Sequence, residues 1–295
     1  MRALRAYLSC VHHQSKPAVT YLNPMQIDPT ATLFSPVKTH FQKLAALGLV
    51  LALSACAGGS GSQYKAKSEL VENADNALIH AELARGYMQQ KQYAVARDEL
   101  KLALRIDPQH SQSNYIMALL MLELEQYERA EEHFAKAVKY DRENAAAAHD
   151  FGVFLCQISR ERESVEYFEI AATNPLFERA ELSHMRAGEC LARLNDPKAE
   201  LYLKKSLEVN PRLRPALFRL AELKHRSREH FSARAYIERF MAITNPQPAA
   251  LLLAYQIESA LNAKEVAAKY RLQLLEEFPG SEQASVLRRA GRGQR

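Results

Sequence analysis

The chain has 295 residues, of which 47% are hydrophobic and 25% are charged, with only 10 Gly and 12 Pro. This composition argues against wholesale disorder and against a fibrous protein, and the length allows one large domain or two ordinary ones. The formal net charge is +5, but residues 1–55 hold five Lys or Arg against one Asp, so residues 56–295 are close to neutral. Without a basic surplus the body lacks the electrostatic signature of nucleic-acid binding, and we expect no nucleic-acid partner.

A leader with a signal-peptide pattern precedes the body of the chain. Residues 1–36 contain several prolines and no periodic apolar face, so we interpret them as an extension that does not belong to the translated protein, which would start at Val37 or Met25. A short basic stretch then precedes Leu44–Leu53, a run of ten residues without a polar side chain. That run is too short to span a bilayer, which takes about 20 residues, and it is typical of a signal peptide.

The sequence Leu53-Ser-Ala-Cys56 ends the leader and resembles the lipobox of bacterial lipoproteins, whose cysteine is lipidated and becomes the new N-terminus. We therefore expect residues 37–55 to be a lipoprotein signal peptide. Cys56 would carry a diacylglycerol and an N-acyl chain, and we expect no other cofactor. A buried core helix with an ordinary cysteine is the alternative, but the Gly- and Ser-rich residues that follow favour a flexible tether over residues 56–76.

The residue after the lipobox cysteine bears on localisation. By resemblance to the sorting rules of Gram-negative lipoproteins, Ala57 predicts the periplasmic face of the outer membrane as the destination. Stable attachment to a bilayer generally takes more than one acyl chain, and the expected lipid on Cys56 meets that condition. We therefore expect the chain to be held at the outer membrane through a lipid anchor.

From Asn76 onward the hydrophobic pattern is helical, and it recurs about every 34 residues. Dipeptides that end in proline mark the turns, at Asp107-Pro108, Asn174-Pro175, Asn210-Pro211, Asn245-Pro246 and Phe278-Pro279. A period of this length is typical of a repeat made of two helices and a turn. The predicted helices are 77–90, 94–106, 111–124, 128–141, 145–158, 162–173, 179–193, 197–208, 214–227, 230–243, 248–261 and 264–277.

The first two units resemble the tetratricopeptide (TPR) consensus, with small and large residues in a fixed order: Ala84, Tyr87, Tyr93, Ala96, Leu100 and Ala103, then Ala118, Met121, Tyr127, Ala130, Phe134 and Ala137. Small residues let two antiparallel helices approach closely, and large ones fill the space between turns. Four weaker units follow, and in one of them Arg234 stands where a small residue is expected.

The repeats predict an all-α fold, a right-handed superhelical solenoid of about six TPR helix pairs whose first helices line a concave face. We place this TPR domain at residues 77–280. A short cap and a basic tail are expected over residues 281–295.

The sequence offers no pattern of catalytic chemistry. It contains no Gly-rich phosphate loop, no Ser elbow, no His-Glu-x-x-His and no Cys-x-x-Cys. The His residues are scattered, and pairs of acids lie on helices otherwise laced with Lys and Arg, which is typical of solvated faces. An enzyme with an accessory TPR domain would need a catalytic domain, and no residues remain outside the repeats for one. We expect no catalytic residue, no metal site and no small-molecule substrate.

Two cysteines lie one period apart on the first helices of consecutive repeats, Cys156 and Cys190. Stacking of repeats brings such positions onto neighbouring helices, and an oxidising periplasm would make a disulfide between them plausible. The alternative is a pair of buried thiols used as small hydrophobes. The sequence favours the disulfide over this alternative.

A groove for a partner is predicted on the first helices of the early repeats. Counting from the small residue of each helix, the side chains expected to point inward include Leu78, Arg85, Met88, Tyr115, Leu119, Leu122 and Val153. An apolar stripe that faces solvent is a candidate surface for binding a partner segment. The alternative is that these residues pack against the neighbouring repeat, and the pattern leaves both open.

The third to sixth units carry residues that resemble the PilF/PilW family of type IV pilus biogenesis lipoproteins: Asn144, Phe151-Gly152, Phe154-Leu155-Cys156, Gly188-x-Cys190, Phe231–Tyr236 and Phe278–Ser281. The resemblance covers roughly residues 44–283 and includes the lipobox. His149-Asp150-Phe151-Gly152 departs from it, since the family more often has Asn-Asn-Tyr-Gly there.

This resemblance implies a pilotin, a protein that binds the secretin subunit of the pilus machine, brings it to the outer membrane and promotes its assembly into a ring. Pilus formation and twitching motility would then depend on it. The mechanism would be physical, because the lipid fixes the location and the groove holds a partner segment. The alternative is a TPR lipoprotein that serves as an adaptor for peptidoglycan enzymes or for outer-membrane protein assembly.

Overall fold

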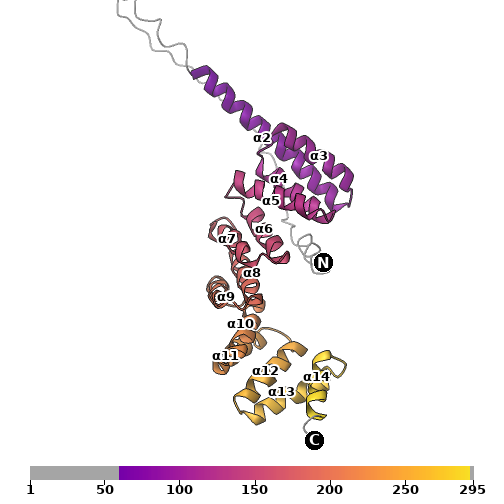
Figure 1. The fold of residues 1–295 in the computed structure, drawn as a ribbon, viewed down its shortest axis with the longest axis vertical. Coiled ribbons are helices and arrows are strands. Elements are labelled where there is room, and N and C mark those ends of the chain that lie inside the picture. The colour runs from indigo at the N-terminus through magenta and orange to yellow at the C-terminus, as the bar shows by residue number, and fades with distance from the viewer. Residues whose placement is uncertain (1–59, 293–295) are drawn as a thin grey trace, which may run out of the picture. The chain divides into compact units, whose positions relative to one another are not determined.

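The computed structural model describes residues 60–292, and every regular element within them is an α-helix (Figure 1). The chain divides into two compact units, Met1–Asn73 and Ala74–Arg295. Of the first unit, only residues 60–73 are described, as the start of helix α2. The upstream extension, the signal peptide, Cys56 and Ala57 lie outside the described residues, so the expectations placed on them stay predictions.

Thirteen helices follow one another in the described part of the chain. Their bounds are α2 (Ser60–Gln89), α3 (Tyr93–Ile106), α4 (Ser111–Glu123), α5 (Tyr127–Tyr140), α6 (Ala145–Gln157), α7 (Glu161–Thr173), α8 (Ala180–Arg193), α9 (Lys198–Val209), α10 (Arg214–Arg226), α11 (His230–Met241), α12 (Pro248–Ala260), α13 (Lys264–Glu277) and α14 (Glu282–Arg292). The all-α, solenoid-like prediction is confirmed.

The helices pack as consecutive pairs. Each of α4, α6, α8, α10 and α12 lies against the helix that follows it, and adjacent pairs also pack against each other. Helix α3 lies beside α2 in the same way (Figure 1), and His80 of α2 is hydrogen bonded to Glu99 of α3 at 2.7 Å. We call α2, α4, α6, α8, α10 and α12 the first helices of the six pairs. Helix α14 caps the last pair, because Ala284 and Leu287 are buried against Leu251 and Leu274.

The turn inside every pair has the same backbone geometry. One residue in each turn has a positive φ of 52 to 64°, at Lys91, Glu125, Ser159, Asn195, Arg228 and Asn262. The next N–H then donates to the carbonyl five residues earlier, as from Gln126 to Met121 at 2.8 Å and from Ala263 to Glu258 at 2.9 Å. This is the Schellman closure of a helix end, and it satisfies carbonyl groups that the helix leaves unpaired.

Four of the turns between pairs are closed by side chains. Asp107, Asp141, Asn174 and Asn210 each accept a hydrogen bond from the backbone N–H two residues later, at 2.8 to 3.1 Å. Asp141 does so although Arg142 stands where the other three turns have proline. The acceptor side chain, rather than the proline, is therefore common to these turns.

Helix α2 begins at Ser60 and not at residue 77. The segment expected to be a flexible tether over residues 56–76 is therefore helical from Ser60 onward. The reason lies in the residue types between Gln63 and Glu72, where Lys, Ala, Glu and Leu favour a helix and neither Gly nor Pro interrupts it. No helix within residues 60–292 combines the length and the apolar character needed to cross a membrane.

The two helices of a pair approach most closely at small residues. Ala96, Ala130, Ser164 and Ala199 are fully buried on second helices. A Cβ atom added to Gly188 on α8 would lie 2.7 Å from Leu203 Cγ and 3.0 Å from the backbone oxygen of Ala199. Backbone cannot rotate away as a side chain can, so this contact fixes the spacing of α8 and α9.

Replacing Gly188 by alanine should therefore lower the free energy of unfolding by about 1–3 kcal/mol, the usual cost of overpacking a core. Gly86→Ala is the matched control, since nothing lies within 4 Å of the added Cβ there. Because alanine favours a helix more than glycine does, Gly86→Ala in α2 should leave the free energy of unfolding unchanged or raise it by up to about 1 kcal/mol. Urea unfolding of the two variants and wild type measures both. Equal stability of Gly188→Ala and Gly86→Ala would contradict the close approach.

Candidate functional site

The predicted groove residues differ in exposure. Leu78 is 41% exposed, and Arg85 and Leu119 are half-buried. Met88, Tyr115, Leu122 and Val153 are buried, with 4 to 8% of each side chain exposed. The expectation that these four present an apolar stripe to solvent is therefore corrected, and they belong to the packed interior of the first three repeats.

Tyr115 shows the physical reason. Its hydroxyl donates to Asp150 Oδ2 at 2.6 Å, from α4 to α6, and its ring lies 6.3 Å from the ring of Phe134. The side chain is thus held between neighbouring helices by a charge-assisted hydrogen bond and an aromatic contact. Burial of this kind depends on the spacing of adjacent repeats, which the period alone does not reveal.

Polar side chains also join the first helices of the later pairs. His149 Nδ1 of α6 is hydrogen bonded to Ser183 Oγ of α8 at 2.8 Å, and Arg219 Nε of α10 donates to Glu189 Oε1 of α8 at 3.3 Å. Neighbouring repeats are therefore connected by hydrogen bonds as well as by apolar packing. Such bonds fix the register of one first helix on the next.

His149 is 3% exposed, with its ring 5.7 Å from Phe168 and 5.8 Å from Phe177. Burial lowers its pKa to about 4, and the charges of Arg179 and Arg186 act in the same direction, whereas Asp150 opposes them. The imidazole is therefore neutral at pH 7. His149 is one of the residues that depart from the sequence motif described above, and it forms a buried contact between two repeats.

We predict that acid destabilises the fold through this residue. Between pH 6.5 and about 4 the unfolded chain binds a proton at His149 that the folded chain does not bind. The free energy of unfolding should therefore fall by up to about 3 kcal/mol as the pH is lowered through this window. In His149→Gln the pH dependence of urea unfolding should be shallower than in wild type. Parallel pH profiles for the two proteins would contradict the assignment.

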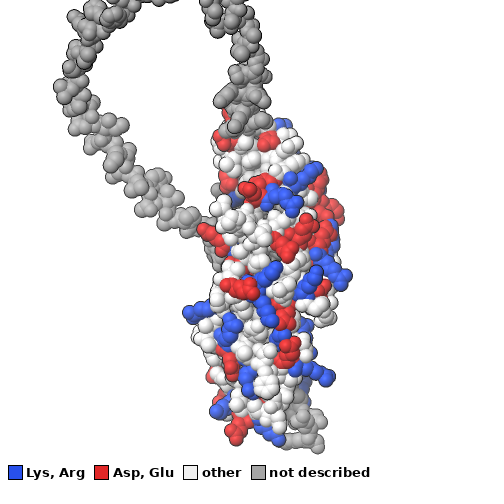
Figure 2. Space-filling model, turned by 90° about the vertical axis from the view of Figure 1, so that its left-hand side faces the viewer, with Lys and Arg blue, Asp and Glu red and all other residues white. Residues whose placement is uncertain are grey.

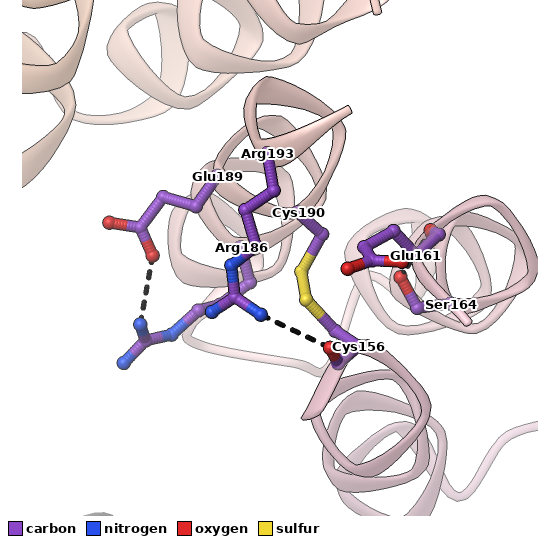
Figure 3. Close-up of a disulfide and its surroundings, with 7 residues drawn as sticks. All are labelled: Cys156, Glu161, Ser164, Arg186, Glu189, Cys190 and Arg193. Carbon is purple, nitrogen blue, oxygen red and sulfur yellow. Dashed lines mark hydrogen bonds and ion pairs between the residues drawn. A yellow bond between two sulfur atoms is a disulfide. The ribbon is translucent and has the colours of Figure 1, made fainter. Parts of the chain in front are cut away.

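A disulfide joins α6 to α8. Cys156 and Cys190 are bonded, with their Cα atoms 5.9 Å apart and a separation of 34 positions along the chain (Figure 3). On one side of the bridge, Arg193 Nη1 donates to the carbonyl oxygen of Cys156 at 3.1 Å. On the other side lies the start of α7, where Ser164 Oγ donates to the Glu161 carbonyl at 2.7 Å. The bridge thus holds the third and fourth repeats together, and Arg193 lies next to it.

Removing the bridge with Cys156→Ala and Cys190→Ala should lower the free energy of unfolding by about 3–4 kcal/mol, because the cross-link restricts a loop of 34 residues in the unfolded chain. A reducing agent should lower the stability of wild type by a similar amount and leave the double variant unchanged. Titration of thiols in the denatured, unreduced protein is the direct check. Two reactive thiols from this pair would show that the cysteines are not bonded.

A groove of about 510 Å³ lies across α8, α10 and α12. Its charged lining comes from the first two of these helices and consists of Arg186, Glu189, Arg193, Arg219, Glu222 and Arg226. Helix α12 contributes the uncharged Leu253 and Gln256. His225 also lines it, and burial together with the neighbouring His230 lowers the pKa of His225.

The groove was missed by the sequence prediction, which placed the binding surface on the early repeats. A sequence signal exists, because Arg-x-x-Glu-x-x-x-Arg begins at Arg186 and recurs one repeat later at Arg219. On the face drawn in Figure 2, basic and acidic side chains are interspersed, in keeping with the balanced charge of the body. The groove lining, with four Arg against two Glu, has a local excess of arginine.

Residues 60–292 contain no group of three or more His, Cys, Asp or Glu side chains placed to hold a metal ion. The sequence predictions of no metal site, no catalytic residue and no cofactor besides the lipid rest on the sequence alone.

Comparison with known proteins agrees with the predicted tetratricopeptide repeats. A family model described as tetratricopeptide repeat matches residues 77–110 and 111–144. The type IV pilus assembly protein PilF of Pseudomonas aeruginosa is 28% identical over 235 residues, which are 79% of this chain and 92% of that protein. The solved structure of PilW, a widely conserved type IV pilus biogenesis factor, is 29% identical, with a TM-score of 0.58 over 72% of this chain and 97% of its own.

The solved structure of Pseudomonas aeruginosa PilF has the same fold, with a TM-score of 0.61, 24% identity and coverage of 74% of this chain and 99% of its own. The chain is therefore similar, over most of its length, to TPR proteins of type IV pilus biogenesis. This is the resemblance that the sequence motifs indicated. TPR folds of this type are typical of scaffold proteins that act without catalysis.

Proposed function

We propose that this chain, a tetratricopeptide-repeat protein similar to PilF and PilW, is a non-enzymatic lipoprotein scaffold of type IV pilus biogenesis. It binds the pilus secretin subunit at the periplasmic face of the outer membrane and promotes its assembly into a ring. The observation that carries the proposal is the similarity to PilF over 79% of the chain. A match of this extent is several times longer than one generic helix pair.

Three features of the chain support the proposed location and mode of action. The Leu53-Ser-Ala-Cys56 sequence is a lipidation signal, and the lipid would restrict the protein to the membrane surface. The disulfide between Cys156 and Cys190 suits an oxidising compartment such as the periplasm. A stack of helix pairs offers an extended surface for a partner segment, which is how solenoids commonly bind.

A strain that lacks the gene tests the proposal. Membranes of the deletion strain should lose heat-resistant secretin multimers and the cells should lose twitching motility, and the intact gene should restore both. Unchanged multimers and motility in the deletion strain would refute the proposed function. Altered peptidoglycan or altered outer-membrane protein content with normal multimers would instead support the adaptor role that the sequence left open.

Lipidation has its own test. Metabolic labelling with a fatty-acid analogue should mark wild type and should not mark Cys56→Ser, because the thiol of Cys56 is the site of acylation. The double variant Cys156→Ala with Cys190→Ala is the matched control and should keep the label. Labelling of Cys56→Ser at the wild-type level would contradict the assignment of the lipid anchor.

A further inference from the structure

The groove across α8, α10 and α12 is lined by two copies of one charge pattern. On α8 the pattern is Arg186, Glu189 and Arg193, and on α10 it is Arg219, Glu222 and Arg226. Positions that are three and four residues apart lie on one face of a helix, so each copy presents all its charges on the same side. Stacking of the repeats then brings the two copies next to each other.

Four of these six side chains pair among themselves. Arg186 Nη1 donates to Glu189 Oε2 at 2.8 Å, and Arg219 Nη1 donates to Glu222 Oε2 at 2.8 Å. Arg219 Nε also donates to Glu189 Oε1 at 3.3 Å, which links the two helices. Two positive and two negative groups form this ladder, so their charges balance.

Arg193 and Arg226 carry the positive charge that this ladder does not balance. Both are exposed at the last turn of their helices, α8 and α10. Arg193 is held by the carbonyl of Cys156, a neutral acceptor (Figure 3). In the described part of the chain neither arginine has an ion pair with a carboxylate. Because α12 adds no charge to the groove, the lining carries a net charge of about +2 at neutral pH.

We propose that this groove binds an extended acidic peptide segment of the partner protein, with Arg193 and Arg226 each taking a carboxylate. A guanidinium group donates two parallel hydrogen bonds to a carboxylate, which suits it better to this task than an ammonium group. Two guanidinium groups on two separate helices match a chain with spaced carboxylates better than one small anion. Gln256, which is exposed, supplies an amide for the peptide backbone.

The size of the groove sets the length of the segment. Adjacent packed helices lie about 8–10 Å apart, so three first helices span about 20 Å. An extended chain covers that distance with about six residues. The inference rests on the proposed function, in that the peptide would belong to the pilus partner, and it adds the chemical class of the contacted segment.

The binding test uses the intact protein purified in detergent and a fluorescein-labelled peptide of about eight residues with alternating Glu and Ser. Fluorescence anisotropy should show binding that weakens with salt, and a matched peptide with Gln in place of Glu should bind at least about tenfold more weakly. The variant Arg193→Gln with Arg226→Gln should lose at least about tenfold in affinity. The control Arg214→Gln, an exposed arginine at the start of α10 outside the groove, should bind as wild type does.

Equal affinity of the double variant and wild type for the Glu peptide would overturn the proposal, as would equal affinity of wild type for the Glu and Gln peptides. Binding to phosphatidylglycerol vesicles with the same arginine dependence, and no binding of the peptide, would assign the groove to a lipid headgroup instead. The variant Arg193→Lys with Arg226→Lys keeps the charge and should bind between wild type and the Gln variant. If the Lys variant binds no more tightly than the Gln variant, the positive charge does not contribute to binding. That result would contradict the proposal.

A test in cells separates this inference from the proposed function. In the deletion strain, the Arg193→Gln, Arg226→Gln variant should restore few heat-resistant secretin multimers, whereas Arg214→Gln should restore them fully. Full restoration by the double variant would show that the groove does not hold the pilus partner, although the protein still serves the secretin. Normal multimers in the deletion strain itself would refute the proposed function, while the peptide measurement would still decide what the groove binds.

Discussion

The close approach of two helices at small residues is the constraint on which the rest of this structure depends. Ala130 and Ala199 are fully buried, and a Cβ atom on Gly188 would come within 3.0 Å of the facing helix, so small residues set the spacing of the two helices. The Schellman turn, with its residue at positive φ, then returns the chain in the same way in every pair. Equivalent positions of consecutive first helices therefore meet, which places Cys156 beside Cys190 and the two copies of the arginine pattern beside each other.

The sequence predicted the helices well, because the small residues and the turn residues recur along the chain. It was less reliable where one residue of register matters. Arg234 was placed at a small-residue position, but the buried residue there is Ala233, and Arg234 instead bonds Glu258 of the next repeat. Helix α2 extends back to Ser60 because strong helix formers precede the first repeat. Of the six positive-φ residues only Asn195 and Asn262 are of a type that favours this conformation, so the sequence marks these turns weakly.

The exposed faces of the first helices were harder to predict, for a physical reason. Whether a side chain on a first helix faces solvent depends on the spacing and rotation of the adjacent repeats, and a linear period does not encode either. Tyr115 and Met88 therefore proved to be buried, and the groove lies in the later repeats. There the ladder of ion pairs neutralises itself and leaves Arg193 and Arg226 available. The disulfide lies next to Arg193, so it helps to hold that part of the proposed binding groove in place.

Site-specific photo-crosslinking in living cells tests most directly whether the groove is the surface that contacts the pilus machine. A photoreactive residue in place of Gln256, exposed on α12 within the groove, should form a crosslink to the secretin subunit. The same residue in place of Leu201, exposed on the second helix α9, should not. Crosslinks from Leu201 and none from Gln256 would contradict the account, because the partner would then bind the outer helices instead of the groove.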